Sequence, residues 1–257
     1  MLDLLTMERM GEGPILIALS GGGDSVALLH FLTHHVGAAR LRAAIVDHKL
    51  REGSGADARK AEDIADAAGV EAYVLELIWA DSANRAHEAA RALRYAALCQ
   101  AARKLGARVI ATGHTRDDQA ETLLLKLIRG AGLTGLAAIY PRRGAIVRPL
   151  LDVARTDLRS YLEERGQSWV EDETNQDLEN PRNRIRRLVL PELDRAYGSA
   201  TTPAIARAAA LIREDAAYLD DVSERRYTEV SVPLPESFIQ AGAGTAQFFT
   251  AYSTSQW

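Results

Sequence analysis

The sequence contains a single cysteine, Cys99, among its 257 residues. One cysteine excludes an internal disulfide, a four-cysteine zinc site and cysteine-pair redox chemistry built within the chain. A reducing compartment fits this composition, and we expect a cytoplasmic protein. Apolar neighbours at helical spacing around Cys99 favour a packing role for its side chain over a chemical one.

An excess of positive charge is also lacking. Lys and Arg number 31 against 35 Asp and Glu, which gives a formal net charge of −4 and a pI of about 5.9. This balance excludes a uniformly basic surface that coats nucleic acid, so any RNA contact must come from local basic patches. Long hydrophobic runs are missing too. The apolar stretch from Pro14 to Leu19 is too short to span a bilayer and no signal-like leader precedes it, so we expect no membrane association.

Short apolar runs that alternate with helical patterns are present. Four runs predict strands, namely Ile15–Leu19, Leu41–Val46, Val70–Leu77 and Arg108–Thr112. Apolar positions at helical spacing predict helices over 25–36, 56–68 and 84–105. Strands that alternate with helices are typical of a doubly wound α/β fold, in which helices cover both faces of a parallel sheet.

The rest of the chain is expected to be mostly helical. Helical spacing predicts one helix over about 154–165 and a long amphipathic helix over about 203–227. We therefore predict a catalytic domain over residues 1–200, a long helix or linker over 201–230, and a tail over 231–257 whose pattern indicates no structure. The sequence leaves the oligomeric state open, and a homodimer is one alternative.

Ligands of doubly wound folds bind beyond the carboxyl ends of the strands, and the first predicted strand leads into Ser20-Gly21-Gly22-Gly23-Asp24-Ser25. Glycines there let backbone amides close on phosphate oxygens, while the following helix start and the two hydroxyls add further donors. Asp24 would repel phosphate unless a magnesium ion lay between them. The alternative is a plain glycine turn in which Asp24 caps the helix.

A second candidate site follows the fourth predicted strand, where Gly113 and His114 precede an acidic helix start. Thr115 can cap this helix, which places Asp117, Asp118 and Glu121 close together on neighbouring faces. Such repulsion would be relieved by a metal ion, a substrate ammonium or an arginine. The alternative is a solvated acidic first turn favoured by the helix dipole, and His114 on its own would more often be structural.

Two basic features are the remaining candidates for functional residues. A cluster follows Pro181, which can start a helix, and it contains Arg182, Asn183, Arg184, Arg186 and Arg187. Arginine at this density fits phosphate binding, and a solvated helix face is the alternative. Arg94, on the third predicted helix, can reach a pyrophosphate or form a surface ion pair.

The loop Ser-Gly-Gly-x-Asp-Ser after the first strand resembles the loop of the N-type ATP pyrophosphatases, which split ATP into AMP and pyrophosphate. The wider pattern resembles the tRNA(Ile)-lysidine synthase family. It runs in order from about residue 14 to 225 and includes the following segments: Val46-Asp47-His48-Lys49-Leu50-Arg51, Glu88-Ala89-Ala90-Arg91-Ala92-Leu93-Arg94-Tyr95, His114 to Thr122, Leu124 to Gly132, Arg148-Pro149-Leu150-Leu151, Glu171 to Asn175, and Arg182-Asn183-Arg184-Ile185-Arg186.

This resemblance implies a ligase that uses ATP and Mg²⁺ to join free L-lysine to the wobble cytidine of an isoleucine tRNA. It implies nucleotide binding by residues 20–25 together with His48 and His114, and metal binding by Asp24 and Asp118. Asp24, Asp117, Asp118, Glu121 and Arg94 are the implied catalytic residues, and the cluster over 182–187 is the implied RNA contact.

The chain departs from the family pattern at Lys49, where glycine is usual, and after Val230, where the family's C-terminal extensions are not matched. Two other functions stay open. A tRNA thiolase of the same superfamily would share the ATP loop, but related thiolases that act on cytidine carry cysteine pairs for an iron–sulfur cluster, and this chain has Cys99 alone. A tRNA-binding protein without activity is the second alternative.

Overall fold

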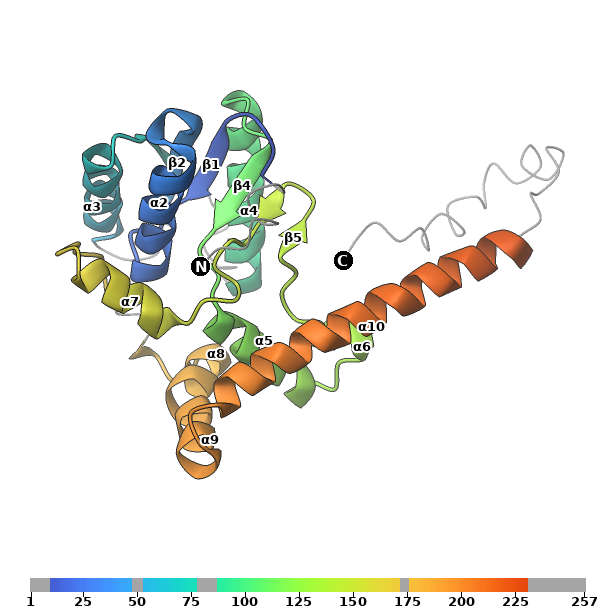
Figure 1. The fold of residues 1–257 in the computed structure, drawn as a ribbon. Helices are drawn as coiled ribbons and strands as arrows, with labels where there is room; N and C mark the ends of the chain where they lie inside the picture. The colour runs from blue at the N-terminus through green and yellow to red at the C-terminus, as the bar shows by residue number, and fades with distance from the viewer. Residues whose placement is uncertain (1–9, 48–52, 78–86, 172–175, 231–257) are drawn as a thin grey trace, which may run out of the picture. The chain divides into compact units, whose positions relative to one another are not determined.

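The computed structural model describes residues 10–47, 53–77, 87–171 and 176–230, and the part of the chain before residue 150 contains a six-stranded sheet (Figure 1). The strand order is β3-β2-β1-β4-β6-β5. Strands β1 (Ile15–Ala18), β2 (Leu41–Asp47), β3 (Glu71–Glu76), β4 (Val109–Thr112) and β6 (Ile146–Val147) run parallel, and β5 (Arg142–Arg143) pairs antiparallel with β6. The predicted α/β fold with a parallel sheet is confirmed.

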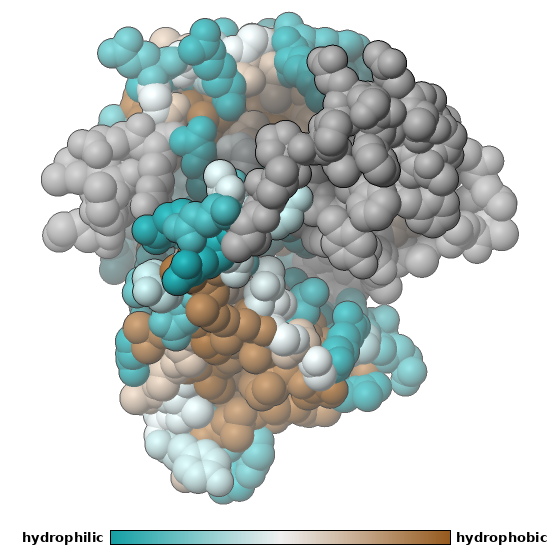
Figure 2. All heavy atoms as spheres, turned by 90° about the vertical axis from the view of Figure 1, so that its right-hand side faces the viewer, coloured by the Kyte–Doolittle hydropathy of each residue, from teal (hydrophilic) through white to brown (hydrophobic). Residues whose placement is uncertain are grey.

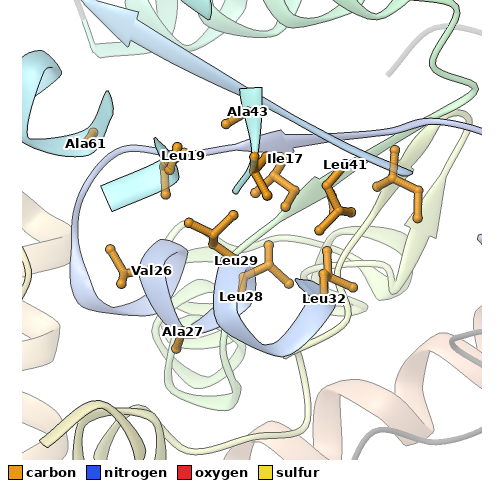
Figure 3. Close-up of a cluster of buried hydrophobic side chains, with 14 of the residues drawn as sticks. Ile17, Leu19, Val26, Ala27, Leu28, Leu29, Leu32, Leu41, Ala43 and Ala61 are labelled. Carbon is orange, nitrogen blue, oxygen red and sulfur yellow. The ribbon is translucent and has the colours of Figure 1, made fainter. Parts of the chain in front are cut away.

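Helices cover both faces of the sheet because successive strand side chains point to opposite sides. Ile15 and Ile17 of β1 pack in one core cluster with α2 (Gly23–Val36), α3 (Ser54–Ala67) and α7 (Arg155–Glu163). Leu16, between them in the strand, packs instead with α4 (His87–Lys104). Figure 3 shows the first cluster, in which leucines of α2 lie against Ile17 and Leu41 of the strands.

The four predicted strands and the helices at 25–36, 56–68 and 154–165 are confirmed to within a few residues of their ends. The expected helix over 84–105 corresponds to α4, and residues 84–86 lie outside the described residues. The two-residue strands β5 and β6 were not predicted, since a pair this short leaves no alternating pattern.

The C-terminal part is helical, as expected. The helices before it are α5 (Arg116–Ile128), α6 (Leu133–Leu136) and α7. The C-terminal part itself consists of α8 (Pro181–Arg184), a π-helical turn η3 (Ile185–Val189), α9 (Leu190–Tyr197) and α10 (Thr201–Val230). The chain divides into two compact units, of which the first ends at Glu214 and the second begins at Asp215, within α10. The predicted domain limits at residues 200 and 230 stay predictions, and the tail over 231–257 lies outside the described residues.

Apolar side chains gather over part of the face shown in Figure 2. In the first unit, the exposed large apolar side chains on α5, α6 and η3 are Leu127, Ile128, Leu133, Leu188 and Val189. None of them belongs to the buried clusters that support the sheet. Among the described helices, none is both long and apolar enough to cross a membrane.

Candidate functional site

The loop between β1 and α2 has a geometry suited to an anion. The Ser25 hydroxyl donates to the Gly22 carbonyl at 2.8 Å and lies 3.1 Å from the Ser20 hydroxyl, so the two serines hold the loop closed. Gly22 is the N-cap of α2, and no side chain of the described residues caps this helix. The first amides of α2 therefore point out of the helix end, where the helix dipole favours negative charge.

Two glycines let this loop pack closely against its neighbours. Gly21 has a φ of +81°, and a Cβ there would lie 3.1 Å from the Val170 side chain. Gly113, just beyond β4, would place a Cβ 2.9 Å from the Asp24 carbonyl oxygen. A side chain at position 113 would force the backbone of α2 to shift, so glycine there permits the end of β4 to lie against the start of α2.

The acidic helix α5 begins as the sequence predicts, with Thr115 as its N-cap. The Thr115 backbone amide donates to Asp118 Oδ2 at 2.8 Å, and the Asp118 amide donates back to the Thr115 hydroxyl at 3.4 Å. This reciprocal pair is a capping box. One oxygen of Asp118 is thus used by the helix cap, and its Oδ1 faces elsewhere.

Arg155, the first residue of α7, joins the loop over residues 20–25 to the acidic helix α5. Its Nε donates to Asp24 Oδ2 at 3.1 Å, its Nη2 to Asp118 Oδ1 at 3.0 Å and its Nη1 to Glu121 Oε1 at 3.2 Å. Its backbone amide donates to Asp117 Oδ2 at 2.8 Å. The three acids predicted on α5 and the aspartate of the loop therefore converge on one arginine.

The basic cluster that follows Pro181 is divided by the structure. Arg182 donates to Glu121 Oε2 at 2.8 Å and to Asp118 Oδ1 at 2.9 Å, and Arg186 donates to Glu121 Oε1 at 2.6 Å. Arg184 and Arg187 are exposed, whereas Asn183 is buried and donates to the Asp177 carbonyl at 2.9 Å. Two of the four arginines thus point toward the acidic site, and RNA binding by the cluster stays a prediction.

Charge and burial act against each other in this network. Burial raises the pKa of the Asp24 carboxyl more than Arg155 lowers it, so that pKa is raised overall. Burial also opposes ionisation of Asp118, but Arg155 and Arg182 outweigh it and hold the pKa of Asp118 below its usual range. Asp118 is therefore ionised, and the pKa values of Arg155 and Arg182 are raised in return because their charges are balanced by Asp118 and Glu121.

The histidine and arginine candidates have partners outside the network around Arg155. His114 is half-buried and lies 2.9 Å from the Thr112 hydroxyl, and burial lowers its pKa to about 3. Its ring is therefore neutral at physiological pH. The Arg94 guanidinium lies 5.3 Å from the Tyr95 ring centre, beside Arg91 at 5.1 Å. His48 lies outside the described residues.

The donor set fits magnesium at Asp24 better than at Asp118. Within the described residues no group of three or more His, Cys, Asp or Glu side chains is arranged to hold a metal. Magnesium needs only one or two carboxylates when phosphate oxygens and water complete its coordination. Asp24 sits beside the helix end expected to hold phosphate and pairs with Arg155, whereas Asp118 contacts three arginines. Asp118 does not fit a metal site in this arrangement.

Sequence reasoning missed Arg155. It lies four residues after the Arg148-Pro149-Leu150-Leu151 segment, but its partners are 34, 37 and 131 positions away in the chain. No local pattern marks an arginine whose partners come from other elements. For Arg182 and Arg186, the spacing of four did carry a signal, since it places both side chains on one helix face.

Comparisons with known proteins agree on the family. A model of the PP-loop domain, ATP_bind_3, matches residues 3–193. The chain is 44% identical to the tRNA(Ile)-lysidine synthase of Salinispora tropica over 84% of this chain and 67% of the relative. It is 41% identical to that of Thermus thermophilus, over 90% of this chain and 44% of the relative. It is 36% identical to that of Pseudomonas fluorescens, over 90% of this chain and 53% of the relative.

Among solved structures, the U34-tRNA thiolase NcsA from Methanococcus maripaludis, with its 4Fe-4S cluster, superposes with a TM-score of 0.67. The match covers 81% of this chain and 76% of the thiolase at 14% sequence identity, so it supports the fold alone. The chain spans about two thirds or less of the length of these curated relatives.

Proposed function

Because the chain belongs to the tRNA(Ile)-lysidine synthase family of PP-loop proteins, we propose that it ligates lysine to carbon 2 of the wobble cytidine of an isoleucine tRNA with a CAU anticodon. ATP is the energy source, and AMP and pyrophosphate leave. The observation that carries this proposal is the convergence of the phosphate loop and the acidic helix, through Asp24, Asp118 and Glu121, on a single guanidinium. A ligase of this kind needs an activating site and a site for an ammonium side by side.

In the first half-reaction, the oxygen on carbon 2 of cytidine attacks the α-phosphorus of ATP and pyrophosphate departs. The amides at the start of α2 and the hydroxyls of Ser20 and Ser25 would hold phosphate oxygens. Arg94, on α4, would stabilise the negative charge of the departing pyrophosphate. A magnesium ion held by Asp24 would supply neutralisation of phosphate charge.

In the second half-reaction, the side-chain amine of lysine attacks carbon 2, the bond to the activated oxygen breaks and AMP leaves. A carboxylate must first attract the ammonium and then accept its proton. Glu121 is fully buried and contacts three arginines, so we assign it to holding those arginines in place. Asp118, which is ionised, and the half-buried Asp117 are the acids we assign to attracting the lysine ammonium.

The test uses the full chain with ATP, labelled lysine and an isoleucine tRNA transcript that carries the CAU anticodon. We expect labelled lysidine in the nucleoside digest and none with a methionine tRNA transcript, which shares the anticodon. Asp118→Asn should bind ATP but form little product, because it removes the charge that attracts the ammonium. No labelled nucleoside from any tRNA would overturn the proposed activity.

The two alternatives predict different results in this assay and in ATP–pyrophosphate exchange. A thiolase would load sulfur and incorporate no lysine, and the single cysteine, Cys99, which packs beside the cluster around Leu98, argues against an iron–sulfur cluster. A tRNA-binding protein without activity would retain tRNA but show no ATP–pyrophosphate exchange. The assembled network around Asp24 and Asp118 favours the ligase over this second alternative.

A further inference from the structure

Arg155 occupies a position that the proposed ligands also need. A guanidinium carries five donors in one plane, and Arg155 uses this plane to contact Asp24, Asp118 and Glu121 together. Its side chain is 15% exposed, against 29% for Arg182 and 27% for Arg186. Within the described residues it is the arginine hydrogen-bonded to both the ATP loop and the acidic helix.

The Arg155 guanidinium contacts the carboxylates that a magnesium ion or a lysine ammonium would also bind. A magnesium ion at Asp24 or a lysine ammonium at Asp118 would lie within a few ångströms of the guanidinium, and like charges at such distances repel strongly in a partly buried site. Either ligand must therefore move the guanidinium away or share a carboxylate with it at a cost.

The backbone of Arg155 is anchored, so such a movement would be confined to its side chain. Its amide donates to Asp117 Oδ2 at 2.8 Å, and the next turns of α7 place Leu158 and Leu162 in the buried core. An arginine side chain has several rotatable bonds and can leave its partners while α7 stays in place. Helix α7 can thus stay in place while the Arg155 guanidinium changes its position.

We propose that Arg155 is a positioning residue that neutralises the acidic site before substrates bind, and that magnesium–ATP and lysine displace its guanidinium in turn. This inference rests on the proposed function. When the nucleotide takes Asp24, the guanidinium keeps two of its three carboxylate partners and is easier for lysine to displace. The two ligands therefore strengthen each other's binding, and by linkage the factor is the same in both directions.

The experiment measures binding to the full chain by calorimetry, with free lysine and with the magnesium complex of α,β-methylene ATP, which cannot release pyrophosphate. Arg155→Met removes the charge and keeps most of the side-chain length. Arg155→Lys keeps a charge that serves one carboxylate at a time. Arg159→Met is the matched control on the same helix, because its side chain is 49% exposed and pairs with Glu171 at 3.7 Å, which is none of the three carboxylates that Arg155 contacts.

In the unmodified protein and in Arg159→Met, we expect the nucleotide to tighten lysine binding by about fivefold or more, the usual scale of such coupling. In Arg155→Met the coupling factor should fall to near one, and lysine alone should bind more tightly than to the unmodified protein. Arg155→Lys should show an intermediate factor, and it provides the decisive comparison if Arg155→Met does not fold.

Weaker lysine binding to a folded Arg155→Met protein, or coupling that persists in it, would overturn the inference while leaving the proposed function intact. If the unmodified protein binds no lysine with or without nucleotide, the proposed function fails instead. The inference is then decided by the nucleotide alone, and it is overturned unless Arg155→Met binds the ATP analogue more tightly than Arg159→Met does.

Discussion

Gly113 offers a direct test of the close approach between β4 and the ATP loop. Its φ lies outside the left-handed region, so alanine is allowed there by backbone conformation. The added Cβ would lie 2.9 Å from the carbonyl oxygen of Asp24 and 3.1 Å from the amide nitrogen of Ser25. These neighbours are backbone atoms in the first turn of α2, so the loop itself must move by several tenths of an ångström.

Two magnitudes follow from this displacement. Overpacking of a well-filled site costs about 1–3 kcal/mol in the free energy of unfolding. A misplacement of about 1 Å at a reacting centre can cost about 100-fold in rate, so a shift of roughly half that distance predicts about a tenfold loss of ATP–pyrophosphate exchange in Gly113→Ala. The loss should exceed what the change in stability alone produces, since the protein stays folded at assay temperature.

The assay is tRNA-dependent ATP–pyrophosphate exchange, with urea unfolding of the same preparations. Gly55→Ala in α3 is the matched control, because a Cβ at this position would have no heavy atom of the described residues within 4 Å, and alanine favours a helix by about 0.5–1 kcal/mol. Normal exchange and stability in Gly113→Ala would show that the loop does not depend on this close approach.

Other changes separate chemistry from packing and RNA binding. Asp24→Asn should lower exchange by about 100-fold without loss of circular dichroism, because it removes a charge suited to magnesium, while Cys99→Ser should keep product formation. Replacing the exposed Arg184 and Arg187 with alanine should flatten the salt dependence of tRNA binding, with a slope smaller by about 0.7 for each phosphate that is no longer neutralised, and leave ATP affinity unchanged. His114 is held neutral with a folded pKa of about 3, so the unfolded chain binds more protons between about pH 3 and pH 6.5. Stability should therefore fall as pH drops through this window, as followed by urea unfolding, and His114→Gln should flatten that dependence.

The fold was predictable because its determinants are local and repeated. Each of the four main strands is a short apolar run, and Ile15, Leu16 and Ile17 show why: three consecutive apolar residues are needed where helices cover both faces of the sheet. Strands β5 and β6 lacked this signal, since Arg142 and Arg143 are exposed and only two residues pair in each strand.

The arrangement of the candidate site was predictable in part. The loop over 20–25 and the acids of α5 could be found because each is a compact pattern that follows a strand. The direction of the arginines after Pro181 could not be read from their density, and Arg182 and Arg186 turn toward Glu121, away from the exposed Arg184 and Arg187. The number of arginines in a segment indicates its positive charge. The packing of the helices decides which acidic side chain each arginine contacts.

The sequence also leaves open which cation balances the acids of α5. Three carboxylates within five positions predict a compensating cation, and the prediction named a metal, an ammonium or an arginine as equal candidates. In the described residues the chain supplies the cation itself, three times over, through Arg155, Arg182 and Arg186. Breaking such a buried pair by removing one partner costs about 3–5 kcal/mol, whereas exchanging one cation for another leaves each carboxylate paired. If a lysine ammonium replaces one of these arginines, as we propose, the carboxylate stays paired, and the cost of its entry is the cost of moving the displaced guanidinium away from its partners.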